Sequence, residues 1–417
     1  MTGYFIQAFI YLFAAVIAVP IAKRLGLGSV LGYLIAGVVI GPVIGLVGSE
    51  TATIQHFAEF GVVMMLFLVG LELEPRMLWD MRHRLIGLGG LQVGLTTAAV
   101  MGICLALNLD WGLALTIGLI FSLSSTAIVL QTFNEKGLTK TEGARSAFSV
   151  LLFQDIAVIP MLALIPLLAI PELVEQAQNA VQAASNQHEE LSLVANISGV
   201  YYALVIIVAI TGVVVGGHYL SRPLFKFVAS SKVQEIFTAT SLMLVIGIAA
   251  IMNLVGLSPA LGAFLAGVVL ATSEFRHQLE ATIEPFKGLL LGLFFMTVGA
   301  GINFTILLNE TSTIFSITLT LMLVKGLVLL ILTLVFKIKG SDRWLLALSL
   351  AQAGEFGFVL IGFTVNNHVL PTDLAQTLSL SVALSMFLTP ALFIFYDRII
   401  LPRDIDKTNQ QESDNID

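Results

Sequence analysis

Apolar runs long enough to cross a membrane recur from one end of this chain to the other. A helix needs about 20 mostly apolar residues to cross a hydrocarbon layer about 30 Å thick. Only 11% of the 417 residues are charged, whereas soluble globular domains contain about 25%. The sequence therefore excludes a water-soluble architecture and predicts an all-α polytopic membrane protein.

Thirteen candidate spans result when the apolar runs are divided at their breaker and charged residues. Each span is long enough to cross most or all of a bilayer as a helix. In chain order they cover residues 4–22, 28–47, 54–72, 85–107, 112–133, 145–170, 197–220, 233–252, 258–273, 286–308, 313–336, 344–366 and 374–396.

The basic residues support this division, because Lys and Arg concentrate in short cytoplasmic loops near the ends of spans. Of the 20 Lys and Arg residues, all but Lys325 follow an odd-numbered span. The loops after even-numbered spans carry acidic residues instead, such as Glu50 and Asp110. One missed or invented span would disrupt this alternation. We therefore expect thirteen spans, with the N-terminus outside and the C-terminus in the cytoplasm.

The membrane domain is predicted over residues 1–402 and an acidic cytoplasmic tail over 403–417. The tail has almost no apolar residues, so we expect it to be disordered. Residues 171–196 form the one long external loop, which is polar, acidic and interpreted as a solvated connector. No basic residue precedes the first apolar run, which predicts a retained span in place of a cleaved signal peptide.

An internal repeat is indicated by the spacing of polar residues inside four spans. Ser125 precedes Asp155 by thirty residues, and Glu355 precedes Ser385 by the same interval. Inverted repeats with paired broken helices are a hallmark of secondary transporters. The first repeat would cover residues 1–170 and the second residues 232–396, with a linking helix over residues 197–220.

Several other functions are excluded by what the sequence lacks. The single cysteine, Cys104, lies inside an apolar run, so neither a disulfide framework nor a cysteine metal cluster is expected. The six histidines show no ligand spacing, and no P-loop is present for an ATP-driven pump. The net charge of −7 does not indicate a nucleic-acid partner. We therefore expect that the protein is not an enzyme and that it binds no cofactor and no metal other than a transported ion.

Three ionisable residues fall near the middle of predicted spans, namely Asp155, Lys325 and Glu355. A charge at this depth costs roughly 2.5–3.5 kcal/mol on insertion scales, so each instance needs a reason. A carboxylate there binds either a proton or a dehydrated cation. Competition between the two for Asp155 is sufficient for exchange. The alternative is a fixed Asp155–Lys325 pair that ties two helices together.

Small and polar residues interrupt the fifth and twelfth spans. In the fifth, Ser124, Ser125 and Thr126 supply hydroxyl oxygens as ion ligands, and in the twelfth, Gln352 precedes Glu355. Such patches fit helices that unwind where they line a cavity, although ordinary packing of small residues is the alternative. If both helices break and cross, Lys325 or Glu355 would neutralise the dipoles of the half-helix ends.

Several longer stretches resemble the monovalent cation–proton antiporters, in particular the Kef-type glutathione-regulated potassium-efflux proteins. The resemblance covers essentially the whole membrane region. The matching stretches are RLGLGSVLGYLIAGVVIGP at 24–42, HFAEFGVVMMLFLVGLELEP at 56–75, LSSTAIVLQ at 123–131, RSAFSVLLFQDIAVIP at 145–160, IEPFKGLLLGLFFMTVG at 283–299 and AGEFGFVL at 353–360.

The resemblance implies a sodium/proton antiporter-like fold with a dimerisation scaffold and a mobile core, in which spans 5 and 12 are broken and crossed. It also implies a homodimer, embedded in lipid, that works by elevator-like alternating access. The family's ion-binding acid matches Asp155 with Gln154 beside it, and its mid-membrane lysine matches Lys325. A Gln-Asp pair, in place of two adjacent acids, resembles the potassium-type arrangement.

Two departures from the Kef pattern concern regulation. The family's acidic regulatory loop here begins at His277 and retains Glu280 and Glu284, but Thr282 stands where an aspartate is usual. Full-length Kef proteins carry a cytosolic nucleotide-binding domain after the last span, which this sequence does not include. Glutathione and nucleotide control therefore stay open.

Our leading hypothesis is a potassium/proton antiporter of the bacterial inner membrane. A sodium/proton antiporter of the same fold is the nearest alternative, since the site residues do not determine ion radius. From another class, a gated potassium channel is opposed by a single buried acid and by the lack of a filter-like carbonyl loop. A sensor that binds the ion without moving it is the remaining alternative.

Overall fold

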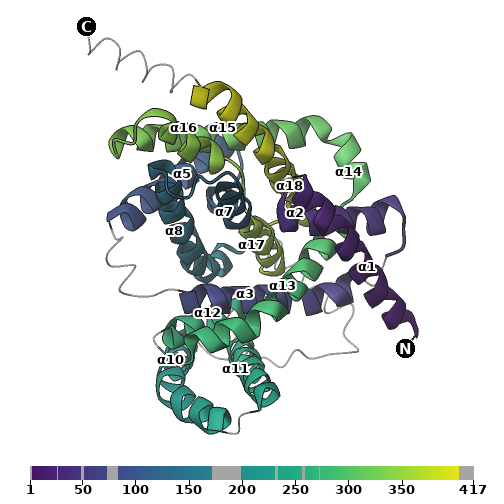
Figure 1. Ribbon diagram of the computed structural model, residues 1–417, viewed down its shortest axis with the longest axis vertical. Coiled ribbons are helices and arrows are strands. Elements are labelled where there is room, and N and C mark those ends of the chain that lie inside the picture. The colour runs from purple at the N-terminus through teal and green to yellow at the C-terminus, as the bar shows by residue number, and fades with distance from the viewer. Residues whose placement is uncertain are drawn as a thin grey trace. The chain divides into compact units, whose positions relative to one another are not determined.

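The computed structural model describes residues 2–25, 27–47, 51–72, 83–170, 199–230, 233–255, 259–271 and 273–402. Within these residues the chain consists of helices and short connections, with no strand, which confirms the all-α prediction (Figure 1). The predicted external loop and the acidic tail both lie outside the described residues.

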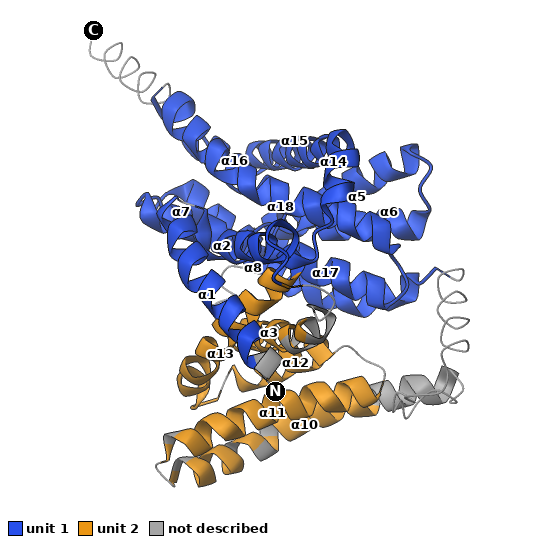
Figure 2. Cartoon of the chain, turned by 90° about the vertical axis from the view of Figure 1, so that its right-hand side faces the viewer, with its two compact units in different colours: residues 1–46, 81–174, 298–417 blue, residues 47–80, 175–297 orange. Residues whose placement is uncertain are grey.

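The chain forms two compact units, and the first contains residues 1–46, 81–174 and 298–417 (blue in Figure 2). Both halves of the predicted repeat contribute to it. Its helices are α1 Thr2–Arg24, α2 Gly28–Val38, η1 Val39–Val43, η2 His83–Gly89, α5 Gly90–Ala106, α6 Trp111–Ser122, α7 Thr126–Glu135, α8 Glu142–Leu164, η3 Ile165–Leu168, α14 Phe304–Asn309, α15 Thr311–Val335, α16 Gly340–Ser349, α17 Glu355–Asn366, α18 Thr372–Phe395 and η4 Tyr396–Ile400.

The second unit contains residues 47–80 and 175–297 (orange in Figure 2). Glycines allow its helices to pack closely: a Cβ on Gly70 would lie 2.4 Å from the carbonyl oxygen of Phe264. Close backbone approach at small residues is typical of helix packing in membranes. Its helices are α3 Thr51–Glu72, α10 Gly199–Ser230, α11 Gln234–Leu254, α12 Pro259–Leu270 and most of α13 Arg276–Ala300.

Eight stretches of the described residues are long and apolar enough to cross a membrane by length and composition. Four further apolar helices are shorter, among them the second half of the interrupted twelfth span, Glu355–Asn366. The protein is therefore a helical membrane protein. The count of thirteen spans and the direction of insertion stay predictions.

Both predicted helix breaks are present. Helix α6 ends at Ser122 and α7 begins at Thr126, with Leu123 and Ser125 extended between them. Likewise, α16 ends at Ser349 and α17 begins only at Glu355. The polar and small residues in these stretches allow the change, because a hydroxyl such as that of Ser125 caps the next helix by accepting from its backbone N–H.

One apolar cluster of buried side chains lies in the first unit beside the two breaks. Phe133 of α7 meets Phe393 of α18 edge to face, with ring centroids 6.1 Å apart. Leu151 of α8, Leu329 of α15 and Leu346 of α16 complete the same cluster, each wholly buried. The half-helices α7 and α16 and the long helix α8 thus pack against the same neighbours, α15 and α18.

Candidate ion-binding site

The two interrupted helices of the first unit meet at their breaks. The hydroxyl of Ser124 donates a hydrogen bond of 3.0 Å to the carbonyl oxygen of Leu350. The backbones approach so closely that a Cβ on Gly354 would lie 2.3 Å from the oxygen of Ser124. Figure 1 shows α7 and α17 beside α8, which carries the predicted ion-binding acid. The crossing thus gathers four half-helix ends in one place.

Asp155 lies on α8 and faces the start of α7. The Thr126 hydroxyl donates to both carboxylate oxygens of Asp155, at 3.2 Å to Oδ1 and 3.4 Å to Oδ2. Both side chains are partly exposed, unlike their buried neighbours at the crossing. A carboxylate and a hydroxyl that are reachable from outside the core supply oxygen ligands of the kind that hard cations bind.

Gln154, the residue before Asp155, uses its side-chain amide for hydrogen bonds within the protein. Its Oε1 accepts 2.7 Å from the backbone N–H of Ser124, and its Nε2 donates 2.7 Å to Gln92 Oε1. Gln92 Nε2 in turn donates to the Ser122 carbonyl at 3.0 Å and to Thr96 at 3.2 Å. The amide of Gln154 therefore holds the unwound backbone of the first break in place.

Gln92 is a member of this network that the sequence analysis missed. It is wholly buried on α5, in the middle of an apolar span. Polar groups inside a membrane are costly and need partners, so an isolated glutamine in the fourth span was a usable signal. Its partner on α8, 62 residues later, could not be identified from spacing alone.

Lys325 is wholly buried on α15, and its ammonium bonds to backbone carbonyls. Its Nζ donates to Leu123 O at 2.5 Å and to Gln352 O at 2.9 Å. Leu123 is the C-cap of α6, and Gln352 follows the end of α16. One positive charge therefore lies at the negative dipole ends of two half-helices. These contacts match the expectation that Lys325 neutralises the dipoles of the half-helix ends.

Glu355 provides the complementary charge at the other two half-helix ends. It is the first residue of α17 and is 6% exposed. Its Oε1 accepts a 3.3 Å bond from the backbone N–H of Ala127 in the first turn of α7. A carboxylate near two helix N-termini is stabilising. The four dipole ends at the crossing are thus matched by one lysine and one glutamate.

The two breaks use equivalent bonds to their neighbouring long helices. In the first, the N–H of Ser124 donates to Gln154 Oε1 thirty residues on. In the second, the N–H of Ala353 donates 3.0 Å to Ser385 Oγ, 32 residues on. This agreement supports the predicted inverted repeats, whose boundaries stay a prediction.

The predicted regulatory segment belongs to the second unit and begins a helix where a loop was expected. Helix α13 already starts at Arg276 and contains His277, Glu280 and Glu284. Leu279 and Ile283, one turn apart, are both fully buried in that unit's core. This i, i+4 pair makes the segment amphipathic and explains the helix. His277 Nδ1 lies 3.7 Å from Glu280 Oε2 at the surface.

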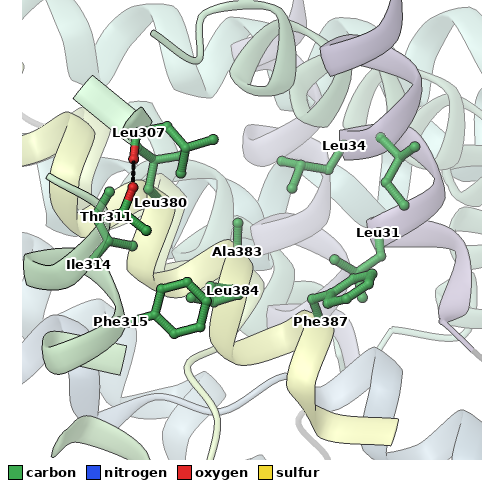
Figure 3. Close-up of a pocket in the computed structure, with 11 residues that line it drawn as sticks. Leu31, Leu34, Leu307, Thr311, Ile314, Phe315, Leu380, Ala383, Leu384 and Phe387 are labelled. Atoms are coloured by element: carbon green, nitrogen blue, oxygen red, sulfur yellow. Dashed lines mark hydrogen bonds between the residues drawn. The ribbon is translucent and has the colours of Figure 1, made fainter. Parts of the chain in front are cut away.

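A separate pocket of about 200 Å³ in the first unit offers no cation ligands (Figure 3). Leu31 and Leu34 of α2, Phe315 of α15 and Phe387 of α18 line it. Its one polar side chain, Thr311, donates its hydroxyl to a backbone carbonyl of the preceding turn. No group of three or more His, Cys, Asp or Glu within the described ranges could hold a metal ion.

Crossed, interrupted helices with compensating charges define a helical membrane protein of the ion-exchanger class. The transmembrane sodium/hydrogen exchanger family matches residues 10–394. The chain therefore belongs to the sodium/hydrogen exchanger family.

Curated relatives are similar to this chain over nearly its whole length. The glutathione-regulated potassium-efflux system protein KefC of Cronobacter sakazakii is 45% identical over 99% of this chain, and KefC of Escherichia coli strain K12 is 44% identical. The chain spans 63% of the length of each of these relatives.

A solved structure shares the fold. The sodium proton antiporter MjNhaP1 from Methanocaldococcus jannaschii at pH 8 aligns with a TM-score of 0.65 and 16% identity, covering 95% of this chain and 96% of that one. This likeness confirms the predicted antiporter-like fold.

Proposed function

We propose that this chain is a secondary antiporter that exchanges a monovalent cation for protons by alternating access around Asp155. The observation that carries the proposal is the Thr126–Asp155 contact beside the crossing of two interrupted helices. In this position the carboxylate has a hydroxyl neighbour and is partly exposed, while the charges of the crossing itself are already matched by Lys325 and Glu355.

Exchange follows from the chemistry of one carboxylate. The anionic form binds a cation, and the neutral form carries a proton, so either partner leaves the moving core with the same net charge. A bare carboxylate within the hydrocarbon layer is costly. The carboxylate therefore crosses the membrane only with a cation or a proton bound. This requirement opposes movement of the empty carrier and so opposes leakage of either ion alone.

Potassium is the proposed cation. The relatives at 44–45% identity are named as potassium-efflux proteins. Asp155 also follows an uncharged residue, Gln154, whose amide is occupied by the broken helix. A Gln-Asp pair, in place of two adjacent acids, resembles the potassium-type arrangement of the family. Sodium is the alternative because the family includes sodium/hydrogen exchangers.

We further propose that the protein is a homodimer in the bacterial inner membrane, with its N-terminus outside and its C-terminus in the cytoplasm. The alternation of basic loops supports this orientation. The relatives are named as glutathione-regulated. The helical segment with His277, Glu280 and Glu284 is the proposed place for such control, with a cytosolic nucleotide-binding domain as the proposed partner.

The test is proton flux in sealed proteoliposomes that contain the purified chain and an internal pH-sensitive dye. External potassium should drive proton movement at carrier rates, with sodium as the matched comparison. A response to sodium alone would keep exchange and replace the proposed ion. Cation flux with no proton movement would contradict the antiporter proposal and favour a channel.

A further inference from the structure

The break between α16 and α17 contains buried polar atoms that the protein itself does not satisfy. Gln352 is wholly buried, and within the described part of the chain neither Nε2 nor Oε1 of its amide has a hydrogen-bond partner. Glu355 Oε2 is in the same condition, although Glu355 Oε1 is bonded. Buried polar groups in native proteins are almost always paired with protein or ordered water, so these three atoms together indicate a ligand.

The donors and acceptors around this break define what that ligand must be. Gln352 supplies one unpaired acceptor and an amide donor, and Glu355 supplies a second acceptor. Lys325 bonds the backbone oxygen of the same glutamine and uses two of its three N–H groups for carbonyls. The unsatisfied set therefore contains donors as well as acceptors.

A cation would satisfy only the acceptors, and the nearby Lys325 ammonium would repel it. Water donates and accepts, and buried waters typically make about three hydrogen bonds to polar groups of this kind. The chemistry of the break therefore matches water better than it matches a second transported ion.

We propose that Gln352 and Glu355 hold at least one resident water at the helix crossing, at a site made of different residues from the Asp155 site. The water hydrogen-bonds Glu355 Oε2 and the Gln352 amide. It hydrates the carboxylate that faces the N-termini of α7 and α17, which keeps that charge in place without contact with bulk solvent. This proposal goes beyond the transport proposal and does not depend on which ion is moved.

Thermal unfolding of the chain in detergent distinguishes an amide that binds water from an amide that is buried without any partner. Gln352→Met keeps the size of the side chain and removes its polar atoms. If the amide holds water, this variant unfolds at a lower temperature by several degrees, as expected also for Gln92→Met, whose amide is fully bonded. A Gln352→Met variant more stable than wild type would overturn the proposal, because removing truly unpaired atoms is stabilising.

A high-resolution cryo-EM map of the wild-type chain in nanodiscs gives the direct answer and needs no variant. We expect a peak within hydrogen-bond distance of Glu355 Oε2 and a Gln352 amide atom. Replacement of potassium by thallium should leave that peak unchanged. Absence of a peak, or a peak that strengthens with thallium, would overturn the water assignment while leaving the transport proposal standing.

Discussion

Gly354 and Ser124 touch backbone to backbone where the two interrupted helices cross, and no Cβ fits between them. An added methyl group on Gly354 would lie 2.3 Å from the oxygen and 2.4 Å from the carbonyl carbon of Ser124. Both are backbone atoms of a segment that Gln154 and Lys325 also hold. The crossing therefore cannot open locally to admit a side chain.

We expect Gly354→Ala to cost about 1–3 kcal/mol of stability or more, the usual range for overpacking, and to abolish exchange. Gly362→Ala is the matched control on the same helix, because nothing lies within 4 Å of a Cβ there. Thermal unfolding of both variants checks this. Equal melting temperatures for the two variants would contradict the close approach at the crossing.

Lys325→Ala should destabilise the protein strongly, since it leaves the carbonyls of Leu123 and Gln352 without this donor. Each buried unsatisfied group costs about 1–3 kcal/mol. Lys226→Ala is the control: its ion pair with Glu274 is exposed, and such pairs contribute about 0–1 kcal/mol. Ion preference, measured as the ratio of potassium-driven to sodium-driven flux, should not change in Lys325→Ala. A stable variant with altered preference would show that Lys325 acts on the ion instead.

Gln92 and Gln154 should be energetically coupled. Each single change to Leu leaves the other amide without its 2.7 Å partner, so the double variant should be less destabilised than the sum of the two. Coupling between residues in one network is typically about 0.5–3 kcal/mol. Gln131→Leu, on the exposed face of α7, combined with Gln154→Leu provides the additive control. Additivity for Gln92 with Gln154 would refute the network.

Thr126→Ala should weaken apparent cation affinity without loss of folding, because it removes the hydroxyl 3.2 Å from Asp155 Oδ1. For a partly exposed hydrogen bond to a charged group we expect about 1–1.5 kcal/mol, or roughly a 5- to 12-fold rise in the half-saturating potassium concentration. Thr126→Ser retains the hydroxyl and should behave as wild type. Equal affinities in the Ala and Ser variants would remove Thr126 from the site.

The sequence predicts those site residues whose insertion into a bilayer costs free energy. Asp155, Lys325 and Glu355 stand out because charge in the hydrocarbon layer needs a reason, and the Ser-rich and Gly-rich patches mark both breaks. The family resemblance further predicted that the two breaks cross, and the hydrogen bond from Ser124 to Leu350 shows that they meet.

The partners of these residues depend on tertiary contacts that local sequence does not encode. The partners of Lys325 could not be read from the sequence, and the structure places its ammonium between the carbonyl oxygens of Leu123 and Gln352. Gln92 could have been noticed as a lone glutamine in an apolar span, but its partner Gln154 is distant in the chain and could not be identified. The segment from His277 was expected as a loop, since burial of Leu279 and Ile283 becomes visible only in the folded unit.

In the proposed mechanism, Asp155 is the carboxylate for which the cation and the proton compete. The most direct measurement is potassium-driven proton flux in proteoliposomes with Asp155→Asn, beside Asp110→Asn as the control. Asp110 caps the start of α6 through Gly112, and Asn preserves that cap. We predict no flux above empty liposomes for Asp155→Asn at unchanged melting temperature, and wild-type flux for Asp110→Asn. Undiminished exchange in Asp155→Asn would contradict the account.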